Sequence, residues 1–352
     1  MIITFYSPML KLSGGNIVMV RYAEYLAKNN IDVYVVAPAE KKSEYVKNGV
    51  TYRTFKKIPN KYFEHIFFQL IYIYAFYLNT PKCDIIIPVF FPLIIHSIIA
   101  KKMHKCSKII SFFQDSKQMF WFGKYIYFLL KIPFITNSVD KFIAVSTPIA
   151  NDIQKYVSKE IVVIPNGIEH EYFYPRDTQK ENYILFVGSS SKMKGLQYFL
   201  TAFKQLQKKY PDLKAKIVSQ TVTNENNPNI EYVNIGNDRN KLGELYSKAL
   251  AFVSQSLSDS FGLPPLEAMA CGTAVVLTDT VGAKEYAVNG ENSIIVPVKN
   301  PACTANAIDE LLSNKNLCLK LQENGLMIAQ NYNWKDSFKA LKKELVSIYV
   351  DN

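Results

Sequence analysis

The sequence predicts an α/β protein of two Rossmann-like domains, each built on a doubly wound parallel sheet, that face a central cleft. At 352 residues, the chain has the length of two domains. Its 49% apolar and 20% charged residues supply two cores and exclude intrinsic disorder. Short runs rich in Ile, Val and Phe alternate with helical stretches, as in parallel sheets that helices cover on both faces.

Six strands are expected in each half of the chain. Those of the first half are Ile2–Tyr6, Asp32–Ala37, Asp84–Pro88, Lys108–Phe113, Phe142–Val145 and Ile161–Ile164, with a helix over Asn16–Lys28. Those of the second half are Tyr183–Val187, Ala215–Ser219, Glu231–Asn234, Ala251–Val253, Ala274–Leu277 and Ser293–Val296. Because these runs do not alternate between polar and apolar residues, the strands are expected to be buried on both faces.

The acidic and aromatic segment Pro165–Asp177 marks the break between the halves. We therefore expect an N-terminal domain over 1–165, a hinge over 166–178, a C-terminal domain over 179–333 and a final helix over 334–352. The helix is predicted from the spacing of Phe338, Leu341, Leu345 and Ile348. Doubly wound sheets bind ligands at the carboxyl ends of their strands, so the ligand is expected in the cleft between the domains.

The positive charge is confined to the first half. Residues 1–165 hold 21 Lys and Arg against 10 Asp and Glu, which is the whole net charge of +11, and residues 166–352 are neutral. This asymmetry indicates an acidic partner for the first domain. The five cysteines form no C-x-x-C pair and fit a reducing compartment. With neither a secretory signal nor an apolar run of about 18–20 residues, a cytoplasmic protein, peripheral at the inner face of the membrane, is expected.

The segment from Ser258 to Val276 carries the densest pattern. Pro264 and Pro265 suit the first turn of a helix, and Gly272 suits its end. The amino end of this helix faces the loop Ser260–Gly262 and could hold an anion. Asp259 and Glu267 flank the loop, and carboxylates beside an anion site suit a ligand with phosphates and hydroxyls, as in a sugar nucleotide. The alternative is a strand-to-helix connector with a solvated acid.

This segment resembles the donor-site signature of the retaining family-4 glycosyltransferases, which have the GT-B fold: an acidic residue, F-G-L-P, and then L-E-A-M-A-x-G. Other motifs of the family follow in order: Gly14-Gly15, 139–146, 163–168, Val187-Gly188 with Lys194-Gly195, and Gly282 with Glu285. The resemblance implies a final helix that crosses back to the N-terminal domain. It also implies that the leaving diphosphate accepts the proton of the acceptor.

The resemblance also assigns roles to residues. The donor diphosphate would be held by Gly14, Gly15, Ser189, Lys192, Lys194, Gly262 and Leu263. The donor sugar and ribose would be held by Asp259, Ser260, Phe261, Gly262 and Glu267, with Glu267 on the ribose and Asp259 on the sugar hydroxyls. The candidate catalytic residues are Asp259, Glu267, Gln114 and Asp115.

The chain departs from the family at three positions. Ser189 replaces an arginine, whose charge Lys192 would supply, and Asp259 replaces a longer glutamate. Gln114 stands where many members carry a histidine and cannot serve as an acid or base. Asp115 is a candidate substitute, although a carboxylate here could equally cap a helix.

No metal or cofactor is expected. The chain lacks D-x-D, histidine pairs at metal-binding spacing and a P-loop, so helix ends with Lys192 or Lys194 would meet the diphosphate charge.

An anionic membrane is the expected partner of the first domain. The aromatic stretches 62–77 and 119–130 lie near lysines, of which Lys117, Lys124 and Lys131 fall on one helical face. Buried helices with a solvated lysine side are the alternative. Nucleic acid is not expected, since no motif for it is present.

The resemblance, together with these observations, implies a glycosyltransferase that moves a hexose or N-acetylhexosamine from a nucleotide-diphosphate sugar to a glycan or lipid-linked acceptor. UDP is favoured as the nucleotide and GDP is the second choice. Transfer with retention of anomeric configuration, in cell-surface polysaccharide synthesis, is the expected role. Two alternatives are a catalytically weakened homologue that binds glycans or a partner protein, and a nucleotide-sugar epimerase.

Overall fold

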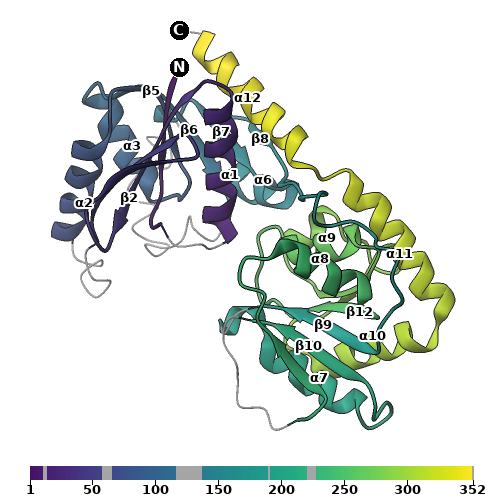
Figure 1. The fold of residues 1–352 in the computed structure, drawn as a ribbon. Coiled ribbons are helices and arrows are strands. Elements are labelled where there is room, and N and C mark those ends of the chain that lie inside the picture. The colour runs from purple at the N-terminus through teal and green to yellow at the C-terminus, as the bar shows by residue number, and fades with distance from the viewer. Residues whose placement is uncertain (11–13, 58–65, 116–136, 189–190, 220–226, 351–352) are drawn as a thin grey trace. The chain divides into compact units, whose positions relative to one another are not determined.

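The computed structural model describes residues 1–10, 14–57, 66–115, 137–188, 191–219 and 227–350 and forms two compact units (Figure 1). Unit 1 comprises Met1–Pro165 with Ser337–Asn352, and unit 2 comprises Asn166–Asp336. Each unit is built on its own sheet, and the predicted class of two doubly wound parallel sheets is confirmed.

The sheet of unit 1 has the order β3-β4-β2-β1-β5-β6-β7-β8. Its strands are β1 (Ile2–Tyr6), β2 (Asp32–Ala39), β3 (Glu44–Lys47), β4 (Val50–Lys56), β5 (Cys83–Pro88), β6 (Cys106–Phe113), β7 (Lys141–Ala144) and β8 (Ile161–Val163). All pairs are parallel except β3 with β4. Helices α1 (Gly14–Lys28), α2 (Ile66–Asn79), α3 (Leu93–Lys102) and α6 (Thr147–Gln154) belong to the same unit.

Strands β3 and β4 were not predicted. They form a hairpin around Asn48 and Gly49, whose φ angles are 54° and 80°. Two consecutive positive φ angles define the two-residue turn that Asn-Gly favours most strongly. The dipeptide was therefore a usable signal, but β3 is exposed along its whole length and so shows no buried apolar run.

The final helix, α12 (Trp334–Val350), packs on unit 1 from Ser337 onward. Phe338 stacks on Tyr25 of α1 with 4.4 Å between ring centroids, and Ser337 Oγ donates a hydrogen bond of 2.6 Å to the carbonyl of Pro165. Leu341 and Leu345 are fully buried. The apolar spacing in the sequence thus corresponds to the face that α12 buries.

Unit 2 has a six-stranded sheet of order β11-β10-β9-β12-β13-β14, parallel throughout. The strands are β9 (Tyr183–Val187), β10 (Lys214–Val218), β11 (Ile230–Val233), β12 (Ala251–Ser254), β13 (Ala274–Thr278) and β14 (Ile294–Val296). The helices are α7 (Leu196–Leu206), α8 (Arg239–Lys248), α9 (Leu263–Ala270), α10 (Pro301–Ser313) and α11 (Lys315–Gln330), with short 3-10 turns η3 (Lys192–Lys194) and η4 (Gly282–Glu285).

The segment 166–178, predicted as a hinge, belongs to unit 2. Ile168 forms a bridge with Asn333, and Phe173 is fully buried. Glu169, one of the acidic residues of this segment, therefore belongs to the unit that contains the predicted donor-site signature.

Candidate functional site

The strand order of unit 2 places a topological switch point between β9 and β12. Chain order runs outward from β9 to β10 and β11 on one side, and from β12 to β13 and β14 on the other. Because β9 and β12 are parallel neighbours, the loops that follow Val187 and Ser254 start side by side. In open α/β sheets the ligand site lies at the carboxyl ends of such strands.

These two loops bring Lys194 and Asp259 together. Lys194 Nζ lies 3.0 Å from Asp259 Oδ2, and the side chains are 36% and 21% exposed. The loops are also joined by a backbone hydrogen bond of 2.8 Å from the N–H of Leu257 to the carbonyl of Met193. A partly exposed pair of this kind contributes about 1 kcal/mol or less, so a doubly charged phosphate group can compete for the lysine.

Gly195 fixes the geometry of this contact. It has φ +70°, and a Cβ added there would lie 1.9 Å from the carbonyl oxygen of Gln255. Only glycine therefore allows the turn after Lys194 to approach the loop that carries Asp259.

The loop between Asp259 and α9 is held from the other side by the η4 segment. The N–H of Gly282 donates a hydrogen bond of 2.9 Å to the carbonyl of Asp259, and the Tyr286 hydroxyl donates one of 2.6 Å to the carbonyl of Gly262. Gly262 has φ +82° and precedes α9, whose first turn contains Pro264 and Pro265. The predicted loop Ser260–Gly262 is thus fixed at the amino end of a helix, where backbone N–H groups favour anions.

Glu267 lies on α9 and is only 6% exposed. Its Oε1 is 2.9 Å from Arg239 Nη2, and its Oε2 accepts a hydrogen bond of 3.3 Å from the Tyr246 hydroxyl. Burial raises the pKa of the Glu267 carboxyl above its usual range, while the charge of Arg239 and the bond from Tyr246 act to lower it. The carboxylate is therefore a buried hydrogen-bond acceptor whose charge depends on its neighbours.

Sequence reasoning missed Arg239, Tyr246 and Glu169. Arg239 also forms an ion pair with Glu169 through Nε, and its guanidinium lies 4.9 Å from the centroid of the Phe173 ring. The pattern Asp238-Arg239, with Asp238 capping α8, was visible, but nothing local in it indicates a contact with Glu267, which is 28 residues away.

The remaining predicted residues divide between the two units. Lys192 is exposed in η3 of unit 2, and Leu263 is the first residue of α9. Ser189 lies outside the described residues. In unit 1, Gly14 and Gly15 begin α1. Gln114 and Asp115 follow β6.

Gln114 is buried at the carboxyl end of β6. The residue is 8% exposed, and its Nε2 has no hydrogen-bond partner within the part of the chain that the structure describes. A buried amide N–H without a partner is costly, so this donor is suited to a ligand oxygen.

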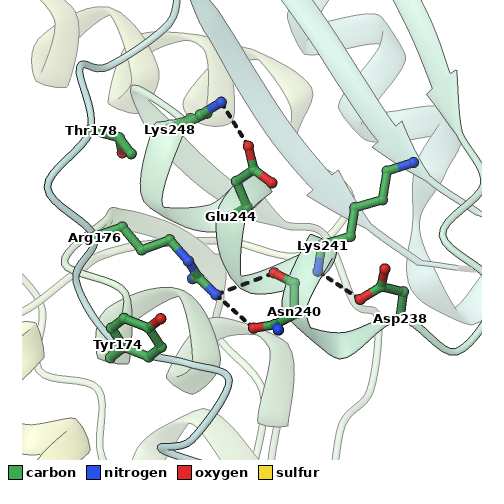
Figure 2. A pocket seen from close by; sticks show the side chains of 8 residues that line it. All are labelled: Tyr174, Arg176, Thr178, Asp238, Asn240, Lys241, Glu244 and Lys248. Carbon is green, nitrogen blue, oxygen red and sulfur yellow. Dashed lines mark hydrogen bonds and ion pairs between the residues drawn. The ribbon is translucent and has the colours of Figure 1, made fainter.

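An open pocket of about 580 Å³ lies beside α8 (Figure 2). Two of its charged side chains have partners in the pocket wall: Arg176 donates to Asn240 Oδ1 at 3.2 Å, and Lys248 pairs with Glu244 at 2.7 Å. None of the predicted site residues lines it. We assign it no role.

Among the described residues, no three His, Cys, Asp or Glu side chains lie close enough together to hold a metal ion. Metal independence itself stays a prediction.

Two family models match consecutive parts of the chain. Residues 12–172 match the model of Glycosyltransferase Family 4, and residues 173–327 match that of Glycosyl transferases group 1. The chain belongs to the group 1 glycosyltransferases. The predicted family is therefore confirmed and the protein is a glycosyltransferase, while its retaining mechanism stays a prediction.

The relatives of this glycosyltransferase include one uncharacterized glycosyltransferase of Methanocaldococcus jannaschii that is 29% identical over 92% of both chains. Another from the same organism is 29% identical over 217 residues, 60% of each chain. A D-inositol 3-phosphate glycosyltransferase of Paenarthrobacter aurescens is 26% identical over 50% of this chain, and the match spans 48% of its own length.

Solved structures resemble the glycosyltransferase over its whole length. The sucrose-phosphate synthase of Thermosynechococcus elongatus matches 100% of both chains with a TM-score of 0.83 and 18% identity. Anabaena HepE, solved in complex with UDP and glucose, matches 99% of this chain and 100% of its own, with a TM-score of 0.77 and 15% identity. At these identities the likeness shows the fold alone, which is the GT-B fold.

Proposed function

We propose that the protein transfers a hexose or N-acetylhexosamine from a nucleotide-diphosphate sugar, with UDP favoured, to a glycan or lipid-linked acceptor. The observation that carries the proposal is the grouping of Lys194, Asp259 and Glu267 in unit 2. The first two lie at the carboxyl ends of β9 and β12, and the third lies on the helix that follows. Anabaena HepE, which has been solved in complex with UDP and with UDP-glucose, supports a donor of this class.

Each residue has a role in this proposal. Lys194 releases Asp259 and binds the diphosphate, whose negative charge grows as the sugar leaves. Asp259 then accepts hydrogen bonds from sugar hydroxyls, and Glu267 accepts those of the ribose. The acceptor oxygen bonds to the anomeric carbon on the face from which the diphosphate departs, and the phosphate oxygen takes the acceptor proton. Retention follows from attack on that face, and Gln114, which cannot titrate, needs to do no proton transfer.

A thermal-shift panel without metal tests the donor class. A nucleotide present at one hundred times its Kd stabilises the fold by about 2.7 kcal/mol, which is a visible rise in Tm. We expect UDP and UDP-sugars to raise Tm in the presence of EDTA, and ADP and CMP to leave it unchanged. A rise in Tm with GDP-sugars alone would identify GDP, and not UDP, as the nucleotide of the donor.

If no nucleotide raises the Tm of a folded sample, the result would favour a glycan-binding or partner-binding protein without transferase activity. A shift that requires Mg²⁺ or Mn²⁺ would contradict metal independence. Turnover of a UDP-sugar to its epimer without an acceptor would favour an epimerase.

We further propose that unit 1 docks on an anionic membrane through α2. This helix contains no charged residue, and its described part buries Tyr72 and Phe76 while Leu70, Tyr74 and Leu78 are exposed at four-residue spacing. Lys105, which follows α3 in the chain, places its ammonium 4.9 Å from the centroid of the Tyr77 ring, near the carboxyl end of α2. An exposed apolar face beside this cation, on a half with a charge of +11, suits an anionic lipid surface.

The second predicted membrane stretch, 119–130, and Lys117, Lys124 and Lys131 lie outside the described residues. Among the described helices, none has the length and apolar character needed to cross a bilayer. The membrane proposal therefore rests on surface docking by α2.

Vesicle sedimentation at low salt tests this docking. We expect several-fold more protein on phosphatidylglycerol vesicles than on phosphatidylcholine vesicles, and a loss of that excess in the double variant Tyr74→Ser/Leu78→Ser. Leu319→Ser, which removes an exposed leucine from α11 of unit 2, is the matched control and should bind as the wild type does. Equal binding of the wild type to both vesicles would disprove the docking.

A further inference from the structure

The Glu267 carboxylate is held in a network that the donor-site signature does not contain. Arg239, the first residue of α8, donates to Oε1 at 2.9 Å, and Tyr246, two turns later on the same helix, donates to Oε2 at 3.3 Å. Both oxygens of Glu267 therefore have a partner from α8, and the remaining lone pairs are free for other donors.

Arg239 is itself fixed from a third element. Its Nε forms an ion pair with Glu169, which lies in the segment before β9 and is 10% exposed, and its guanidinium lies over the ring of Phe173. The Arg239 side chain is 32% exposed and that of Glu267 is 8% exposed, so water reaches only the arginine side of this ion pair. An arginine held by two carboxylates and an aromatic face has little freedom to leave.

The charge of Glu267 depends on this arginine. Burial raises the pKa of the carboxyl, Arg239 and the Tyr246 hydrogen bond lower it, and the charge of Glu169 raises it. Tyr246 on α8, Cys271 at the end of α9 and Tyr286 after η4 are the other titratable groups that interact with it in the described structure. Of all these groups, Arg239 is the one cation.

We propose that Arg239 is a positioning residue, which keeps the Glu267 carboxylate charged and oriented to accept hydrogen bonds from the ribose hydroxyls of the donor. The inference rests on the proposed function, because that function supplies the ribose. Glu169 and Phe173 hold Arg239 in place, so that α8, α9 and the segment before β9 meet at one guanidinium.

Titration of UDP by calorimetry across pH 5.5–8.5 tests the proposal. In Arg239→Met the buried carboxyl loses its cation and takes up a proton at higher pH. UDP affinity should then fall about tenfold or more toward pH 6 and approach that of the wild type at pH 8.5, since one unit of pKa corresponds to a tenfold change. The pH at which half of the affinity is lost should move upward. Arg239→Lys, which keeps the charge, should restore most of the wild-type profile.

Lys241→Met is the matched control. It removes one positive charge from the same turn of α8, where Lys241 is exposed and contacts Asp238 only through its backbone N–H. Its UDP profile should follow that of the wild type. A loss in Arg239→Met that is equal at every pH would indicate a structural role. A loss for UDP without a loss for uridine would show that Arg239 binds phosphate. Either result would overturn the proposal.

A measurement without donor separates this inference from the proposed function. The ¹³C carboxyl signal of Glu267, followed by NMR as pH is changed, should titrate at higher pH in Arg239→Met than in the wild type. If it does so while no nucleotide binds, the donor proposal fails and the electrostatic role of Arg239 stands. If the midpoint does not move, the inference is wrong whatever the protein binds.

Discussion

Replacing Glu267 by alanine is expected to weaken UDP binding at least tenfold, as measured by calorimetric titration at pH 7.5. The side chain supplies a buried carboxylate, and hydrogen bonds to a charged acceptor are worth about 1.5–3 kcal/mol each. That range corresponds to a loss of about 10- to 150-fold in affinity. Because Glu267 is 6% exposed, the ribose hydroxyls that lose this acceptor face a buried position and not bulk water.

The variant must be shown to be folded before its affinity is compared, because Glu267→Ala also removes one partner of Arg239. Breaking a fully buried pair costs about 3–5 kcal/mol, and the 32% exposure of Arg239 reduces that figure here. Glu267→Gln keeps the volume and one acceptor oxygen, and should lose less affinity. Glu323→Ala, on the exposed side of α11, should change nothing. A folded Glu267→Ala protein with wild-type UDP affinity would refute the ribose-binding role.

The fold could be predicted because the information for it is local. Strands such as β5, β6 and β9 are runs of Ile, Val and Phe that only a doubly covered parallel sheet buries, and all six strands predicted in each half are present. The hairpin of β3 and β4 was not predicted: β3 is exposed along its whole length, and β4 is mostly buried but has no continuous run of Ile, Val and Phe. The Asn48-Gly49 turn was a local signal for it.

The site could be predicted in part. Lys194 and Asp259 are 65 residues apart, yet both follow strands that are neighbours at a switch point, so topology alone brings them together. The partners of Glu267 obey no such rule. Arg239 reaches it from the amino end of a helix, and Glu169 reaches Arg239 from a segment that reads as a hinge. Contacts of this kind are set by how helices pack, which a single sequence does not encode at any fixed spacing.

Replacing Lys194 by alanine should weaken UDP binding about 10- to 100-fold while changing uridine binding less than about threefold, in parallel calorimetric titrations. The Lys194 ammonium is the partly exposed cation that faces Asp259. A charge-assisted hydrogen bond from it to phosphate contributes about 1.5–3 kcal/mol, which corresponds to this loss of affinity. Since an exposed ion pair contributes about 1 kcal/mol or less, loss of the Asp259 contact should cost little stability. The effect should therefore appear in affinity and not in Tm.

Two comparisons make the assignment specific. Lys204→Ala removes an exposed cation from α7, the helix that follows Lys194, and should leave both titrations unchanged. Lys192→Ala tests whether the neighbouring lysine supplies the charge that Ser189 lacks. If Lys192→Ala loses the larger share of UDP affinity, the diphosphate lies over η3 and away from Asp259. If Lys194→Ala loses it, release of Asp259 by the incoming diphosphate becomes the step that frees this carboxylate for the sugar.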